Sequence, residues 1–355
     1  MAVSRTHRRE EPRSLRWSTV PPAEPATDPG DLTALTPASS RGTKDGQSKG
    51  GSLFTVVLAF AANLVIAVAK TVAAVLTGSA SMLAEAAHSW ADTGNEIFLL
   101  IAERRSGRRR DEQHPLGYGR EAYVWSMFAA FGLFSAGAIV SISHGIGELR
   151  NPEEGTDYLV AYIVLAVSFV LEGTSFAQAL RQSRKDAKAF GRTTLGFVLN
   201  TSNPTLRAVF AEDSAALIGI LIAGAGIVLH EVTGNAVYDA AGSIGVGLLL
   251  GVVAVVLIDR NRRFLVGEAV PADARARILA FILAQPEVAR VTYLHLEFVG
   301  PSRLYLVAAI DITGEANETT VAYRLREVER ELEVEDVVEE AVLTLSTPEE
   351  RSLTA

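Results

Sequence analysis

The stretch SASMLAEAAHSWADTGNEIFLLI, residues 79–101, decides the fold of this chain. It is mostly apolar and long enough to cross a bilayer, yet it carries Glu85, His88 and Asp92. The spacings i, i+3 and i+7 place these side chains on one stripe of a helix. An ionisable group at membrane depth costs about 2.5 kcal/mol or more, and such groups typically mark an ion or proton pathway. Because histidine and carboxylate together bind divalent metals, the stretch indicates a metal ion moving through a membrane.

Other apolar segments of similar length accompany this stretch, and together they predict six transmembrane helices. The 355 residues have a mean hydropathy of +0.22, which is too apolar for an ordinary soluble protein of this length. We expect spans at residues 53–76, 79–101, 121–146, 157–180, 206–229 and 239–258. Thr77 and Gly78 join the first two spans in a tight antiparallel hairpin. Gly247 and Gly251 form a GxxxG pair, which fits either a dimer face or packing within the bundle.

Basic residues concentrate in alternate loops of the expected bundle. The loops after the second, fourth and sixth spans carry Arg104, Arg105, Arg108, Arg109 and Arg110, then Arg181, Arg184, Lys185, Lys188 and Arg192, then Arg260, Arg262 and Arg263. The opposite loops, ELRNPEEGTD (148–157) and HEVTGNAVYD (230–239), are poor in basic residues. The positive-inside rule therefore places both termini in the cytoplasm. We expect an integral protein of a bacterial plasma membrane.

The segments outside the spans have two different characters. Residues 1–52 lack an apolar run, so we expect a disordered cytoplasmic tail without a cleavable signal peptide, and Glu10, Glu11 and Glu24 count against a transit peptide. Residues 53–260 then form a transmembrane transport domain, 261–347 a small cytoplasmic domain and 348–355 a short tail. In the cytoplasmic domain we expect helices at 272–284 and 319–332 and strands at 288–298, 304–312 and 337–345. The order αββαβ predicts a small α/β, ferredoxin-like sheet with its helices on one face.

The fifth expected span supplies a partner for the stripe of the second. Its sequence AVFAEDSAALIGI, residues 208–220, places Glu212 and Asp213 side by side in an apolar run. Adjacent residues lie about 100° apart on a helix, so we expect only one of the two to face the stripe. His88 and Asp92 with one such carboxylate would make a tetrahedral metal site, completed by water or Glu85. The alternative is a polar packing cluster in which the three stripe residues satisfy one another.

The composition excludes several other kinds of site. The chain has no Cys, which excludes a thiolate zinc cage, a disulfide framework and a cysteine nucleophile. No HExxH motif supports an intramembrane metal hydrolase, and no phosphate loop appears in the soluble part. We therefore expect neither an enzyme nor a resident cofactor, and no nucleic-acid partner.

At this point the chain resembles the cation diffusion facilitator family of metal–proton antiporters, over about residues 53–345. The resemblance rests on HSWAD (88–92), QHPLGYGR (113–120), EDSAA (212–216), Asp239 and the αββαβ order. With Glu172 in LEGTSF (171–176), the chain looks most similar to the branch of the mitochondrial zinc transporter relatives. The resemblance implies efflux of a divalent cation, most often zinc, in exchange for protons by alternating access. It also implies a homodimer formed through the cytoplasmic domain.

One departure from the family pattern leaves the ligand set and the ion open. Position 209, four residues before Asp213, is a valine where the family typically has a ligand. Glu212, Glu85, water or Glu172 are the replacements, and the alternative for Glu172 is a hydrogen bond to Ser168 or Thr174. The candidate metal residues are thus His88, Asp92, Asp213, Glu212, Glu85 and Glu172. Manganese, iron(II), cobalt and cadmium remain alternatives to zinc, and a metal sensor without transport is a distant alternative.

Overall fold

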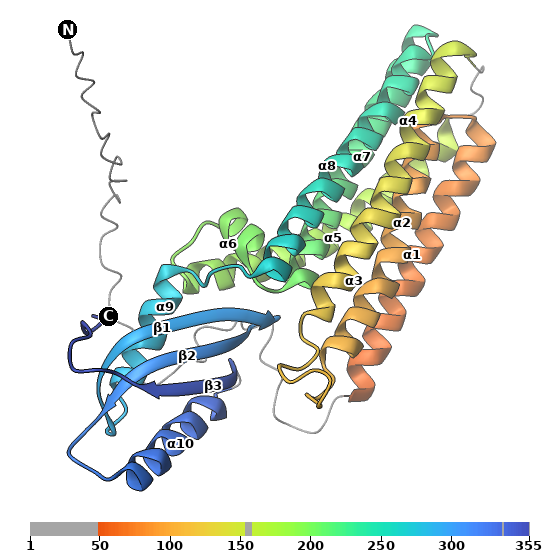
Figure 1. Ribbon diagram of the computed structural model, residues 1–355. Coiled ribbons are helices and arrows are strands. Elements are labelled where there is room, and N and C mark those ends of the chain that lie inside the picture. The colour runs from red at the N-terminus through yellow and green to blue at the C-terminus, as the bar shows by residue number, and fades with distance from the viewer. Residues whose placement is uncertain (1–48, 153–157, 336, 355) are drawn as a thin grey trace, which may run out of the picture.

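The computed structural model describes residues 49–152, 158–335 and 337–354, and it shows a long helical bundle with a small sheet domain at one end (Figure 1). The tail expected at residues 1–52 therefore lies almost entirely outside the described residues. The bundle contains α1 (Lys49–Thr77), α2 (Ala80–Ser106), α3 (Glu121–Ala129), the π-helical turn η3 (Ala130–Phe134), α4 (Ser135–Arg150), α5 (Leu159–Ala189), α7 (Pro204–Thr233) and α8 (Val237–Val266). A short helix, α6 (Thr194–Asn200), lies between the bundle and the sheet domain.

Among the described helices, five are long and apolar enough to cross a membrane. They are Phe60–Thr77 of α1, Glu121–Arg150 through η3, Leu159–Ala189, Pro204–Thr233 and Val237–Val266. The helix α2 has 27 residues but is less apolar than these five, because its polar stripe lies within it. It nevertheless packs against α1, α4, α7 and α8 in the bundle. The predicted helical membrane fold is confirmed, with α2 as the polar sixth helix.

The start of α2 is held by the hairpin before it and by α8. Gly78 has a φ of 65°, which reverses the chain after α1 at no steric cost. Ser79 then caps α2, its hydroxyl accepting a hydrogen bond from the backbone N–H of Met82. From α8, the carboxylate of Asp239 accepts hydrogen bonds from the Ser79 hydroxyl (2.9 Å) and the N–H groups of Ala80 (2.7 Å) and Ser81 (3.1 Å). These bonds fix the depth of the polar stripe relative to α8.

The GxxxG pair of α8 packs within this bundle. A Cβ atom added at Gly247 would lie 3.0 Å from the backbone oxygen of Ala138 and 2.7 Å from the side chain of Ile142, both on α4. Gly251 faces Ala138 at ordinary contact distance. The structure therefore supports the packing interpretation of the two glycines.

The sheet domain follows the predicted element order closely. It comprises α9 (Ala272–Leu283), β1 (Val288–Gly300), β2 (Arg303–Ile312), α10 (Glu318–Val334) and β3 (Val338–Leu345). The sheet order is β1-β2-β3, with β1 and β2 antiparallel and β2 and β3 parallel. The helix α10 makes the crossover that a parallel pair needs. Both helices share one core with alternate residues of β2, so they cover the same face of the sheet, as predicted. These β2 residues are Leu304, Leu306, Ala308 and Ile310.

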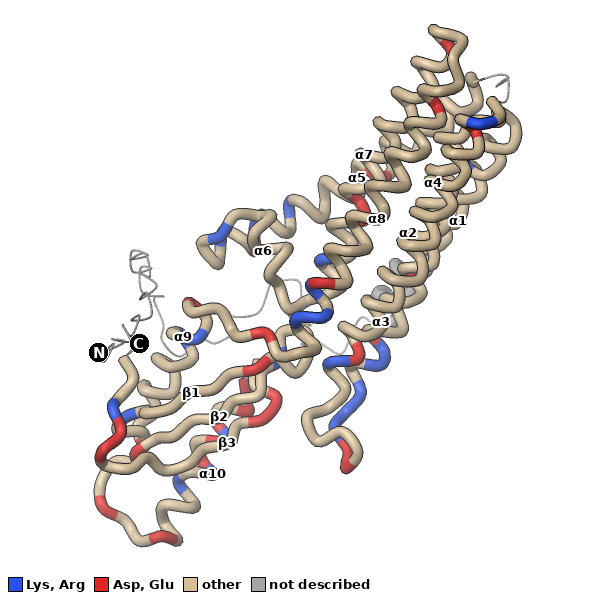
Figure 2. The backbone as a smooth tube through the Cα atoms, turned by 45° about the horizontal axis from the view of Figure 1, so that its top comes forward, with Lys and Arg blue, Asp and Glu red and all other residues tan. Residues whose placement is uncertain are grey.

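The sheet domain contacts the bundle at the end where the basic loops lie. Figure 2 shows Lys and Arg gathered at this end, whereas the bundle helices are mostly uncharged. Arg120, which immediately precedes α3, pairs with Glu297 of β1. Beside it, a Cβ atom on Gly119 would lie 2.7 Å from the Cα of Gly300, so only glycine permits this backbone contact. The QHPLGYGR loop thus forms one contact between the domains.

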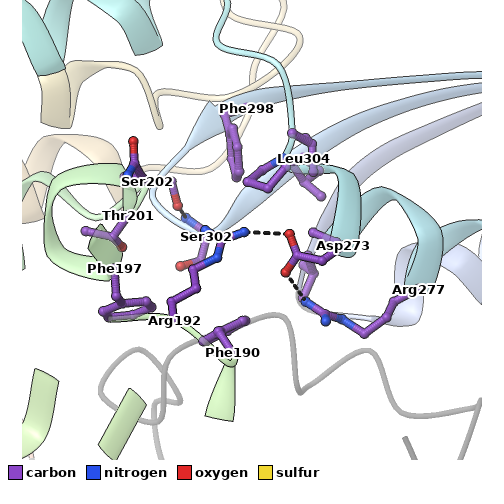
Figure 3. Close-up of a pocket in the computed structure, with 15 residues that line it drawn as sticks. Phe190, Arg192, Phe197, Thr201, Ser202, Asp273, Arg277, Phe298, Ser302 and Leu304 are labelled. Carbon is purple, nitrogen blue, oxygen red and sulfur yellow. Dashed lines mark hydrogen bonds and ion pairs between the residues drawn. The ribbon is translucent and has the colours of Figure 1, made fainter. Parts of the chain in front are cut away.

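The second contact lies between α6 and α9 (Figure 3). Arg192, which precedes α6, pairs with Asp273 of α9 at 2.5 Å, and Arg277 lies 3.5 Å from the same carboxylate. The backbone N–H of Ser302 donates a hydrogen bond to the Ser202 hydroxyl at 3.0 Å. The C-terminal end of α5 is therefore linked to the sheet domain independently of the first contact.

A candidate metal centre inside the bundle

The α2 stripe is buried, as its spacing predicts. Glu85, His88 and Asp92 have exposed fractions of 0%, 1% and 5%. His88 Nε2 lies 3.5 Å from Asp92 Oδ1 without forming a hydrogen bond. Within the described residues, neither His88 ring nitrogen has a hydrogen-bond partner, and neither does this Asp92 oxygen. Buried polar atoms without partners cost about 1–3 kcal/mol each, so they are donor atoms that a metal ion would satisfy.

Glu85 pairs with a residue outside the stripe. In the alternative of a polar packing cluster, it would pair with His88 or Asp92. Its Oε2 atom lies 2.9 Å from Nζ of Lys70 on α1, and the two side chains are 0% and 1% exposed. Lys70 was not among the residues predicted from the sequence. The available signal was a lone lysine in the apolar run NLVIAVAKTVAAVL, residues 63–76, since an intramembrane charge is a functional candidate by default.

Glu212 and Asp213 of α7 face different helices. The Glu212 carboxylate accepts a hydrogen bond from Nδ2 of Asn95 on α2 at 2.5 Å. The Asp213 carboxylate accepts one from the hydroxyl of Ser175 on α5 at 3.0 Å. Glu212 is thus the residue of the pair that reaches the α2 stripe, and Asp213 faces α5, in agreement with their expected separation around the helix.

Two further polar residues of α2 extend the stripe toward the sheet domain. Asn95 is three residues after Asp92, so it continues the same face of the helix and holds Glu212. Glu96 accepts a hydrogen bond from Nδ2 of Asn63 on α1 at 2.6 Å. The helical spacing could have identified Asn95, but its partner on α7 depends on the tertiary structure.

Glu172 of α5 belongs to the same electrostatic cluster. It is half-buried, and its carboxylate is close enough to Lys70, Glu85 and Asp92 to interact electrostatically with each. The hydroxyl of Thr174 donates to the backbone oxygen of Leu171 at 2.8 Å, so it is not the partner of Glu172. Glu172 therefore faces the polar seam between α1, α2, α5 and α7.

The six predicted residues line this seam without forming a closed ligand set. In the part of the chain that the structure describes, no three His, Cys, Asp or Glu side chains are arranged to hold a metal ion. His88 and Asp92 form one half of such a set, and the two carboxylates of α7 are hydrogen-bonded to other partners. Gly219 of α7 faces this half, because an added Cβ would lie 3.4 Å from His88 Nδ1 and inside van der Waals contact with Glu85.

His114 lies in a loop that hydrogen bonds to the Asp111 carboxylate hold together. The Asp111 carboxylate accepts hydrogen bonds from the Tyr118 hydroxyl at 2.7 Å and from the N–H groups of His114 and Gln113. The Tyr118 hydroxyl bond holds the pKa of Asp111 below its usual range, and the same bond raises the pKa of Tyr118. Asp111 thus closes the loop through hydrogen bonds within the protein.

Comparison with known proteins identifies the family. The family described as cation efflux transmembrane domain matches residues 56–266, more than half of the chain. This chain belongs to the cation diffusion facilitator, or cation efflux, family. The cation efflux match covers α2, α7 and every candidate metal residue. Family membership confirms an integral membrane protein of a transporter family whose members are not enzymes.

The relatives of this cation efflux protein include named zinc antiporters. The proton-coupled zinc antiporter SLC30A9, mitochondrial, of Xenopus laevis is 36% identical over 245 residues, and the human protein of that name is 34% identical over 245 residues. Metal tolerance protein C4 of Arabidopsis thaliana is 36% identical over 234 residues. These alignments cover 69%, 69% and 66% of this chain, but only 44%, 43% and 51% of the relatives. The predicted resemblance to the mitochondrial zinc transporter branch is confirmed.

Proposed function

We propose that this protein exchanges zinc for protons across its membrane by alternating access. The observation that carries the proposal is His88, whose two buried ring nitrogens have no hydrogen-bond partner among the residues that the structure describes and lie beside the Asp92 carboxylate. Imidazole with carboxylates suits zinc. The names of the relatives, proton-coupled zinc antiporters, support the same ion and the same coupling.

In this proposal, His88 and Asp92 bind the ion first, and carboxylates of α7 and α5 complete its coordination. Glu212, Asp213 and Glu172 are the candidates, because each lies on a helix that borders the seam. Metal ligands must be deprotonated, so binding of the ion releases protons from these groups. The helices then rock and expose the ion to the other side, where protons displace it.

The proposed direction is out of the compartment that contains the sheet domain. The ends of α2, α5 and α8, which carry the basic loops, lie toward that domain (Figure 1). The positive-inside rule then makes this side cytoplasmic, or its equivalent in an organelle. Pairing of two sheet domains into a homodimer, as the family resemblance implies, remains part of the proposal.

The decisive test is uptake by the full-length chain in proteoliposomes that contain a pH dye. Zinc, manganese, iron(II), cobalt and cadmium are offered in turn, and we expect zinc entry with proton movement in the opposite direction. His88→Ala and Asp213→Ala should abolish both signals. His144→Ala and Asp259→Ala are matched controls, because His144 is exposed and Asp259 pairs only with Arg262 at the surface.

Each other outcome has a definite meaning. Transport that favours manganese, iron(II) or cobalt over zinc would retain the family mechanism and change the ion. Silence for every ion, from protein that is folded and inserted, would overturn the transport proposal in favour of a sensor. Retained transport in His88→Ala would remove the proposed site.

A further inference from the structure

Lys70 brings an ammonium group into the polar seam. It lies seven residues before the end of α1, about 10 Å along the helix from the hairpin, so it is well inside the bundle. Its side chain is 1% exposed and its Nζ atom is 2.9 Å from Glu85 Oε2. The same ammonium group is within electrostatic range of Glu172 and Asp92, so it borders the metal residues and not only Glu85.

The ion pair with Lys70 holds one oxygen of the Glu85 carboxylate, which lies next to the His88 imidazole. Glu85 precedes His88 by one helical turn on the same face of α2. Its second oxygen, Oε1, is buried without a hydrogen-bond partner among the described residues and lies against Gly219, as does His88 Nδ1. Glu85 is therefore close enough to join the coordination of an ion at His88, and Lys70 holds its other oxygen away.

We propose that Lys70 is a specificity-determining positioning residue that keeps one oxygen of Glu85, Oε2, out of the metal coordination and compensates the Glu85 charge. This inference rests on the proposed function and deepens it. With Glu85 held, the ion meets one imidazole and a limited number of carboxylates, which favours zinc. Without Lys70, Glu85 can add its second hard oxygen to the ligand set, and a site richer in oxygen favours manganese relative to zinc.

The test is a four-variant cycle on the full-length protein in detergent: wild type, Lys70→Met, Glu85→Gln and the double variant. Binding of zinc and of manganese is measured by titration calorimetry, and transport of the two ions is measured in proteoliposomes. Lys70→Met should raise the manganese-to-zinc affinity ratio by about tenfold, the lower end of the range for residues that orient metal ligands. The double variant should return the ratio to that of the wild type. Lys185→Met, an exposed lysine of α5, is the matched control.

A second comparison keeps the proposal testable if Lys70→Met alone does not fold. Glu85→Gln leaves the ammonium group without its partner beside the site, so it should weaken the binding of zinc and manganese alike. Removing that charge in the double variant should restore zinc binding by about tenfold relative to Glu85→Gln. Equal zinc affinities in these two variants would overturn the inference.

The inference and the proposed function fail in different ways. If the wild type shows no ion-coupled flux, the proposed function fails whatever Lys70 does. If the wild type transports zinc and Lys70→Met lowers only thermal stability, with the manganese-to-zinc ratio unchanged, Lys70 is a structural ion pair and this inference alone is wrong.

Discussion

Gly219 of α7 lies against the two most buried residues of the α2 stripe. A side chain there would occupy the space in front of His88 Nδ1 and Glu85 Oε1. Glycine in a helix interior costs about 1 kcal/mol relative to alanine, so its presence here is compensated by the close approach of α7 to α2. The close approach brings the polar side chains of α2 within reach of a second helix.

Gly219→Ala should therefore lower zinc affinity, because the added methyl group displaces the ligands of α2. We expect about a tenfold loss, which is typical when ligand orientation is disturbed. Gly224→Ala on the same helix is the control, since its Cβ would meet only Leu165 at 3.9 Å. Binding is measured by titration calorimetry, and equal affinities for the two variants would show that the space at Gly219 is not used.

Asn95 should be a positioning residue for Glu212. Asn95→Ala removes the side-chain donor 2.5 Å from the Glu212 carboxylate, so the carboxylate loses its fixed orientation. We expect about a tenfold weaker zinc affinity, and the double variant with Glu212→Gln should be no worse than Glu212→Gln alone. Additive losses in this cycle would mean that Asn95 acts on another group.

The residues of the site differ in how well the sequence reveals them. Glu85, His88 and Asp92 share one helical face, so their spacing alone predicts the stripe. Lys70 comes from another helix, and a pair that forms between helices leaves no periodic signal in either. The divergence of Glu212 and Asp213 follows from helix geometry, but only the packing of α2 and α5 decides which of them faces the stripe.

At the scale of helices, α2 shows why a polar membrane helix needs external support. Its residues do not reach the hydropathy of the other five spans, because polar groups occupy its inner face. Its first N–H groups are satisfied by Asp239 of α8. Placement of α2 thus depends on hydrogen bonds to a neighbour as well as on apolar burial.

Asp239→Ala should destabilise the bundle. The change leaves two N–H groups and one hydroxyl of the α2 start without their acceptor, and each unsatisfied group costs about 1–3 kcal/mol. We expect a clearly lower Tm in detergent. Asp259→Ala removes only a surface ion pair, worth about 0–1 kcal/mol, and serves as the control. Similar Tm values for both variants would contradict the role given to Asp239.

The boundaries of the strands and of most helices were predictable within a few residues from apolar run length and strand alternation. The helices α5 and α8 continue past their expected ends at 180 and 258 to Ala189 and Val266, because charged turns follow the apolar runs, and α6 was not anticipated. The turn η3 was not anticipated, because a π-helical turn leaves the hydropathy of a span unchanged. Its residue Leu133 lies against Gly94 of α2, so the irregular turn accompanies a close contact with the helix of the stripe.

At the scale of the whole molecule, two short segments that join helices of the bundle also contact the sheet domain. One is the QHPLGYGR loop, which joins α2 to α3 and contacts β1 through Gly119 and Arg120. The other is the segment around α6, which joins α5 to α7 and contacts α9 through Arg192. The first segment follows α2 and the second joins α5 to α7, and these three helices border the seam. A displacement of the sheet domain therefore acts on those helices directly.

Reversal of one charge at the first contact should reveal this coupling. Arg120→Glu places two carboxylates opposite each other at Glu297, so the loop and β1 should separate, and the zinc transport rate should fall several-fold. The pair is partly exposed and worth about 1 kcal/mol or less, so folding and membrane insertion should persist. Glu297→Arg should have the same effect, and the double variant, with the charges exchanged, should recover the rate. A rate that stays at the wild-type value in both single variants would mean that the bundle transports independently of this contact.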